Sequence, residues 1–148
     1  MILDSKLQII SATAVDTTVG TNAEGDTIDL DTIGRDVNSS HNLALVIDVT
    51  TAFTSGGAAT VAFQLVSDAT STLAADGTET LHAQSDTLAY TVLADGFRTV
   101  LPFAGYQTAE RYLGLQVVTA GATTTAGSIS AYLVMDAENW KAYPDGSN

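Results

Sequence analysis

Short segments in which apolar and polar residues alternate run through most of this chain, and this period of two limits what it can fold into. In Leu43–Val49 the odd positions are all large and apolar, whereas Asp48 and Thr50 fall on the other face, which we expect to meet water. Related alternation recurs in residues 61–66, 113–117 and 127–135. Alternation of this kind is typical of half-buried β-strands. Because helical periodicity is hard to find, the sequence predicts an all-β fold.

The alternation also predicts which side chains face the core. In each segment the apolar members of the pattern should point to one side of the sheet, since successive side chains of a strand alternate between its two faces. These residues are Leu43, Leu45, Ile47, Val49, Val61, Phe63, Leu65, Leu113, Leu115, Val117, Ile129, Ala131, Leu133 and Met135. Weaker strand patterns lie at residues 8–12, 27–30, 88–93 and 97–101. They bring the expected number of strands to about eight.

The connections between these segments differ in length. Residues 52–58, which contain Gly56 and Gly57, and residues 119–126 are compact, so we expect each to join neighbouring antiparallel strands as a hairpin. Residues 68–86 form a longer stretch that fits a crossing between sheets with an irregular strand inside it. Short hairpins mixed with long crossings favour an antiparallel β-sandwich of Greek-key, jelly-roll topology.

Length and charge narrow the class of protein. The 148 residues predict one domain, 1–148, with a short N-terminal arm (1–7) and an aromatic C-terminal tail (136–148). Five basic residues face seventeen acidic ones, a net charge of −12, so we expect no nucleic-acid partner. No apolar run approaches the roughly twenty residues that span a bilayer, and no signal peptide is evident. We therefore expect a soluble chain that is not exported and has no membrane partner.

Few residues suggest chemistry, and we expect no catalytic residue, cofactor or metal. The chain has no cysteine, and its two histidines, His41 and His82, have no companion at metal-ligand spacing. No Gly-x-Ser-x-Gly elbow is present. The acidic segment Glu24–Asp31, followed by Asp36, is the one place where Ca²⁺ would find several carboxylates, but its spacing matches no known loop. A solvated acidic edge that discourages aggregation is the alternative reading.

The C-terminal tail uses the largest side chains of the chain in an unusual place. Trp140, the only tryptophan, is followed by Tyr143 and Pro144 after the last predicted strand. Trp and Tyr provide a large apolar area with one polar group, which suits both a lid on the core and an anchor in an interface. The sequence leaves both roles open.

Four stretches together resemble the small capsid cement, or head-decoration, proteins of short-tailed bacteriophages of the Bordetella-phage type. They are Met1–Asp4, Thr51–Val61, Glu110–Leu113 and, most specifically, the strand from Thr125 to Asp136 with the tail Trp140–Pro144. Residues 74–96 depart from the family. The resemblance implies a jelly-roll subunit without catalytic activity on the outer surface of the virion capsid, made in the host cytoplasm. It also implies the major capsid protein as partner and a small homo-oligomer, a dimer first and a trimer as the alternative.

For such a protein the chain ends supply the candidate interface residues. We expect apolar and aromatic anchors at the buried centre and basic side chains pairing with acids at the rim. The candidates are Ile2, Leu3, Lys6, Arg111, Trp140, Lys141 and Tyr143. The rival interpretation is a carbohydrate-binding or adhesin-like sandwich, with or without Ca²⁺, because jelly rolls host many functions. It would use exposed tyrosines, for which the candidates are Tyr90, Tyr106, Tyr112 and Tyr132.

Overall fold

The computed structural model describes residues 7–15, 18–31, 43–103 and 108–135, which form nine β-strands and a short 3₁₀ helix. The strands are β1 (Gln8–Ala14), β2 (Gly20–Asp29), β3 (Leu43–Ser55), β4 (Thr60–Asp68), β5 (Thr80–Gln84), β6 (Leu88–Ala89), β7 (Arg98–Phe103), β8 (Tyr112–Ala120) and β9 (Thr124–Met135). The 3₁₀ helix η2 spans Tyr90–Val92. In the part of the chain described, no helix is long and apolar enough to cross a membrane.

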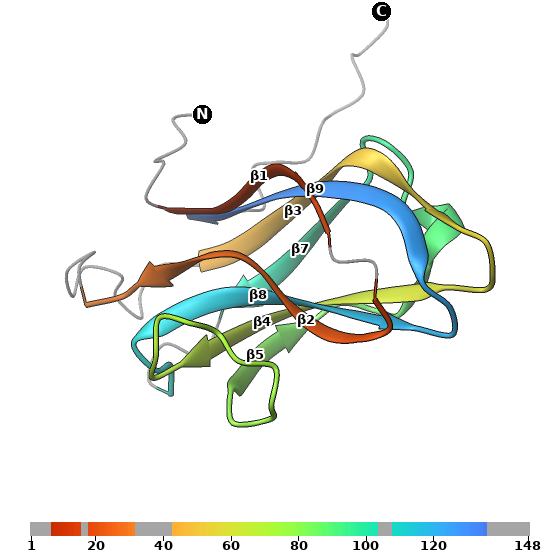
Figure 1. Ribbon diagram of the computed structural model, residues 1–148. Coiled ribbons are helices and arrows are strands. Elements are labelled where there is room, and N and C mark those ends of the chain that lie inside the picture. The colour runs from red at the N-terminus through yellow and green to blue at the C-terminus, as the bar shows by residue number, and fades with distance from the viewer. Residues whose placement is uncertain (1–6, 16–17, 32–42, 104–107, 136–148) are drawn as a thin grey trace, which may run out of the picture.

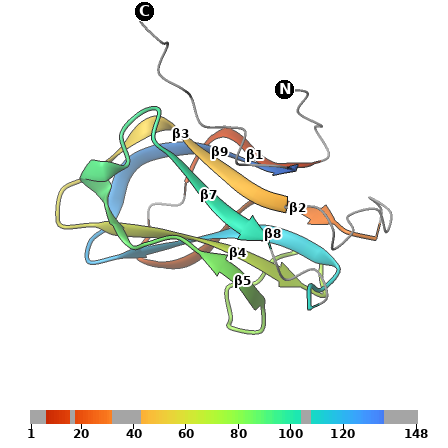
Figure 2. The same cartoon turned by 180° about the vertical axis from the view of Figure 1, so that it is seen from behind.

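Two antiparallel sheets lie face to face (Figure 1). Sheet A has the strand order β1-β9-β3-β7, and sheet B has the order β2-β8-β4-β5, with the two-residue β6 pairing beside β5 on β4. The edge strands β1 and β2 contact each other on one side of the sandwich, and β5 and β7 do so on the other. Figure 2, which views the molecule from behind, shows the side formed by β5 and β7.

The pairing is that of a jelly roll. Strands from the first half of the chain pair in reverse order with strands from the second half: β1 with β9, β2 with β8, β3 with β7 and β4 with β5. The chain is thus a long antiparallel ribbon, folded back at the connection between β4 and β5 and rolled into two sheets. The predicted antiparallel sandwich of jelly-roll topology is confirmed.

The roles predicted for the connections are wrong in three cases. β3 lies in sheet A and β4 in sheet B, so the Gly56–Gly57 turn crosses between sheets and makes no hairpin. The turn between β8 and β9 also crosses. Conversely, the long stretch after β4 stays in sheet B, because the irregular strand inside it is β5, which pairs directly with β4. A short turn usually indicates a hairpin, but here two short turns connect the sheets. They can be short because β3 and β9 stay paired up to their ends at these turns, with Thr54 opposite Ala126.

The core lies between the sheets and contains the predicted residues. The inward positions of β3, β4, β8 and β9 join one buried cluster, and Leu45, Ile47, Phe63 and Leu115 are fully buried within it. Valine, isoleucine, leucine and phenylalanine at every second position suit a pleated surface with one dry face. Met135 ends β9, but its side chain lies outside the described part. For the other predicted core residues the inward orientation is confirmed.

The outer face of sheet A is less exposed to solvent than the alternation predicts. Val46, Tyr132 and Val134 form a second buried cluster on this face, separate from the main core. Beside them Asp48 accepts hydrogen bonds from the Tyr132 hydroxyl and from Nε and Nη2 of Arg98. Burial raises the pKa of Tyr132 to about 12, with the hydrogen bond to Asp48 adding to the shift. The prediction that this face meets water therefore holds for Thr50 but is wrong for Val46.

Three strand boundaries also differ from the predictions. β2 begins at Gly20, well before the predicted residue 27. The prediction missed the first part of this strand because β2 is a polar edge strand in which apolar and polar residues do not alternate. β3 continues to Ser55, through residues assigned to a loop. The stretch 88–93 is a two-residue strand followed by η2, because the chain there leaves sheet B for sheet A.

Candidate functional site

Of the seven predicted interface residues, the structure describes only Arg111. The others lie outside the described residues: Ile2, Leu3, Lys6, Trp140, Lys141 and Tyr143. Arg111 precedes β8, and its Nε and Nη2 donate to the two carboxylate oxygens of Asp29 at 3.0 and 2.9 Å. Its guanidinium also lies 5.1 Å from the centre of the Tyr112 ring. Arg111 thus pairs within the chain with an acid 82 residues earlier, while its contact with a partner stays a prediction.

Two carboxylates of the acidic segment Glu24–Asp31 lie beside an arginine of the same chain. Asp29 is held by Arg111, and Asp31 lies 3.9 Å from the same guanidinium. Glu24 is buried, with only 8% of its surface exposed. Within the described ranges no three acidic or histidine side chains come together as a metal site, and Asp36 falls outside these ranges. The geometry of the described residues therefore adds nothing in favour of Ca²⁺.

Among the residues that the structure describes, Ser67, His82 and Glu110 form a grouping that resembles a catalytic arrangement. Nε2 of His82 lies 2.8 Å from Oγ of Ser67, which also accepts the backbone N–H of Glu110 at 2.9 Å. The Glu110 carboxylate accepts the Thr80 hydroxyl at 2.9 Å. A nucleophile must be reached by substrate, but Ser67 is fully buried. The grouping instead links β4, β5 and the residues before β8, and it gives the His82 imidazole a hydrogen-bond partner within the chain.

His82 predicts a pH dependence of stability. Burial lowers the pKa of its imidazole, and the nearby Glu110 carboxylate offsets this only in part. The unfolded chain then takes up a proton near the usual pKa of about 6.5, before the folded chain does, so stability falls as the pH drops below about 6.5. Between pH 7 and pH 5 we expect the melting temperature of His82→Gln to decrease less than that of the wild type. His41→Gln, at the only other histidine, should keep the wild-type slope; equal slopes for wild type and His82→Gln would contradict the assignment.

The described tyrosines do not form a platform for a sugar. Tyr132 is buried on sheet A. Tyr112 lies opposite Asp68 at one end of β4, whereas the backbone of Tyr90 bonds Ala59 beyond the other end. The nine residues of β4 place its two ends roughly 26 Å apart. Tyr106 lies outside the described residues.

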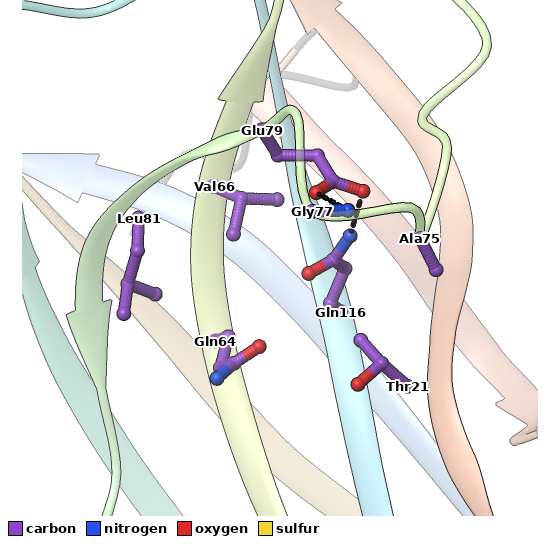
Figure 3. A pocket seen from close by; sticks show the side chains of 8 residues that line it. All are labelled: Thr21, Gln64, Val66, Ala75, Gly77, Glu79, Leu81 and Gln116. Atoms are coloured by element: carbon purple, nitrogen blue, oxygen red, sulfur yellow. Dashed lines mark hydrogen bonds between the residues drawn. The ribbon is translucent and has the colours of Figure 1, made fainter.

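The outer face of sheet B carries a small hollow (Figure 3). The loop between β4 and β5 folds back over this face, and the hollow of about 200 Å³ lies between the loop and the strands. It is lined by Thr21, Gln64, Val66, Ala75, Gly77, Glu79, Leu81 and Gln116. Leu81 is 52% exposed, so the hollow opens to solvent beside an apolar side chain.

Hydrogen bonds fix the loop that makes the wall of the hollow. Gln116, only 3% exposed, donates both amide hydrogens to it: to the carbonyl of Ala74 at 2.9 Å and to Oε1 of Glu79 at 2.8 Å. Glu79 also accepts the backbone N–H groups of Asp76 and Gly77 at 3.1 and 3.0 Å. The carboxylate thus holds the turn of the loop and the sheet together.

Comparison with known proteins identifies the family. The model of the Bbp16 family, named after a Bordetella phage protein, matches residues 5–133. The chain belongs to the Bbp16 family. A search of curated proteins finds no match.

The Bbp16 match covers the sandwich but neither chain end in full. It includes Lys6, Arg111 and every residue of the hollow, and it stops before Trp140, Lys141 and Tyr143. Ile2 and Leu3 also precede it. The prediction of the terminal anchors therefore depends only on the sequence of the two chain ends. The hollow, by contrast, belongs to the part of the chain that matches the Bbp16 family.

Sequence reasoning did not find the hollow of this Bbp16-family chain. A signal was present, because Gln64 and Gln116 occupy the outward positions between the core residues of their strands. Their strand pairing and the return of the loop over them depend on contacts far apart in the chain. A pattern of period two places the two glutamines on an outer face, but it does not bring them together.

Proposed function

We propose that this chain is a non-enzymatic structural protein of a phage virion: a capsid cement protein that binds the outside of the head and stabilises contacts between major capsid protein subunits. The observation that carries the proposal is the match to a phage protein family over residues 5–133. The jelly-roll sandwich agrees with the fold that the cement-protein resemblance implies.

The chemistry of the described residues supports a passive role. Ser67 and His82 lie within hydrogen-bond distance of each other and hold strands together, and Ser67, which is fully buried, also binds the backbone of Glu110. The hollow of about 200 Å³ is smaller than the roughly 300–1,000 Å³ of most small-molecule sites. A binding surface for protein is the simpler use of such a fold.

A cement protein does not need high affinity at each contact. A contact of standard size buries roughly 1,200–2,000 Å² in total. When each copy bridges two capsid subunits, rupture of the shell must break many such contacts together. A homodimer would place two equivalent surfaces on neighbouring subunits, which favours it over a trimer as the unit that binds.

The test is co-sedimentation of the purified chain with phage heads that lack it. We expect saturable binding to expanded heads and a higher temperature of head disruption once the sites are filled. Heads that already carry the protein serve as the matched control, since their sites are occupied. Absence of saturable binding to the expanded heads would contradict the cement role.

Trp140 provides a second prediction. We expect Trp140→Ala to weaken head binding by roughly 30-fold or more, because aromatic anchors at interfaces contribute about 2 kcal/mol or more when truncated. The melting temperature of the isolated protein should not change. Val19→Ala, which trims a 55%-exposed apolar side chain on the sandwich, is the control and should leave both quantities unaltered. An equal loss of thermal stability in Trp140→Ala would assign the tryptophan to a lid on the core.

A further inference from the structure

Two amide oxygens face each other across the hollow on sheet B. Gln64 and Gln116 are register partners on the adjacent strands β4 and β8. Gln116 uses both amide hydrogens on the loop, and Gln64 donates to Oε1 of Gln84 at 2.9 Å. Their carbonyl oxygens therefore point inward from opposite sides (Figure 3). Among the described residues no donor lies within hydrogen-bond distance of either oxygen. The hollow therefore presents two amide oxygens that can accept a hydrogen bond from a ligand.

The Glu79 carboxylate in the wall of the hollow is also an acceptor. The Glu79 carboxylate accepts three hydrogen bonds, which leaves capacity for one more, since a carboxylate offers about four acceptor sites. Gln116 cannot rotate its amide without placing its oxygen against the Ala74 carbonyl and the Glu79 carboxylate. The arrangement is thus held with its oxygens toward the hollow.

We propose that this hollow is a socket for an arginine side chain presented by a partner protein. A guanidinium carries five N–H donors and no acceptor, which is the complement of Gln64 Oε1, Gln116 Oε1 and the Glu79 carboxylate. The exposed Leu81 beside the opening offers an apolar wall for the methylene stem of such a side chain. The net charge of −12 attracts basic partners to the protein as a whole. On the proposed function the partner is a capsid subunit, and in that respect the inference depends on the proposed function.

Other occupants fit less well. A sugar hydroxyl brings lone pairs as well as a donor, and none of the residues that line the hollow is aromatic. Ca²⁺ prefers six to eight oxygens, whereas the hollow offers two amide oxygens and one carboxylate already engaged in three hydrogen bonds. In a second copy, the two arginines that the structure describes, Arg98 and Arg111, are already held in ion pairs with Asp48 and Asp29.

The first experiment tests the socket without a capsid. The full chain, labelled with ¹⁵N, is titrated with a blocked Gly-Arg-Gly peptide, and the side-chain amides of Gln64 and Gln116 and the backbone amide of Gly77 are followed by NMR. We expect saturable shifts with a dissociation constant on the order of 1 mM, as suits a single side chain. The matching citrulline peptide, equal in shape but uncharged, should bind about tenfold more weakly. Equal shifts from a panel of monosaccharides or from CaCl₂ would overturn the assignment to arginine.

Variants separate the hollow from the general negative charge of the surface. Gln64→Leu removes one acceptor without changing the charge and should weaken binding of the Gly-Arg-Gly peptide about tenfold. Gln8→Leu, the same substitution on sheet A, should bind like the wild type. Glu79→Gln should bind still more weakly, and its melting temperature reports whether the loop stays in place. If Gln64→Leu and Gln8→Leu bind the peptide equally, the inference fails.

The second experiment connects the socket to the head. We expect Gln64→Leu to require about ten times the wild-type concentration for half-occupancy of expanded heads, and Gln8→Leu to match the wild type. Equal occupancy by Gln64→Leu and wild type would refute the socket while the cement role stands. Binding of the arginine peptide by a chain that ignores heads would refute the cement role and leave the socket intact.

Discussion

Replacement of Gly127 by alanine is expected to lower the free energy of unfolding by about 2–6 kcal/mol, from backbone strain and overpacking together. Gly127 has φ of +152°, a conformation that side chains rarely adopt, and a Cβ placed there would lie 2.7 Å from two atoms of the Phe53 ring. The backbone cannot easily move away, because the carbonyl of Gly127 accepts the N–H of Val15 at 3.0 Å. Denaturant unfolding measures the loss directly.

Two comparisons separate the two causes. Gly20→Ala introduces a side chain at φ of +134° with nothing within 4 Å, so it should show the strain without the collision. Phe53→Leu, made alone and together with Gly127→Ala, completes a double-mutant cycle. We expect Gly127→Ala to cost clearly less in the Phe53→Leu background. Additive effects would show that the ring is not what excludes a side chain at Gly127.

The core of this fold was predictable because its signal is local. The alternation in Leu43–Val49 and its counterparts on β4, β8 and β9 needs only neighbouring residues to be read, and a shift by one residue would turn every apolar side chain outward. The inward positions followed directly, and so did the all-β class. The long-range pairing of the ribbon was recovered only as a preference for Greek-key topology.

The assignment of strands to sheets was not predictable from the same signal. The Gly56–Gly57 turn has the length and composition of a hairpin, yet it crosses between sheets, because β3 pairs with β9 and not with β4. β2 was largely missed because a polar edge strand buries few side chains and shows no alternation. In both cases the deciding contacts join residues that are far apart in the chain.

The candidate site shows the same division. The sequence singled out Arg111 as a candidate interface residue, but its partner Asp29 lies 82 residues earlier in the chain, so their bidentate contact was not predictable. The hollow is formed by four strands, β2, β4, β5 and β8, together with the loop between β4 and β5, so it depends on contacts that the sequence does not show. Glu79, at the end of that loop, reads in the sequence as one acid among seventeen, and only the contact with Gln116 distinguishes it.

Replacement of Phe63 by alanine is expected to lower the free energy of unfolding by about 3–5 kcal/mol. Phe63 is fully buried on the inner face of β4, and its truncation would leave a cavity between the sheets. Its backbone bonds to Ser85 would remain. For a domain of this size the melting temperature should fall by roughly 6–20 °C. Val100→Ala, at a 40%-exposed position of β7, should stay within about 0.5 kcal/mol of the wild type.

The same substitution tests whether the two sheets unfold together. Each sheet draws its strands from both halves of the chain, so neither can form without the connections that build the other. Phe63→Ala in sheet B and Leu45→Ala in sheet A should therefore each shift one common transition, seen alike by near-UV and far-UV circular dichroism. Two separate transitions in either variant would mean that the sheets are independent units. A single transition in both variants would mean that the two sheets unfold together through their shared core. Any binding surface on this chain would then depend on that core and not on one sheet alone.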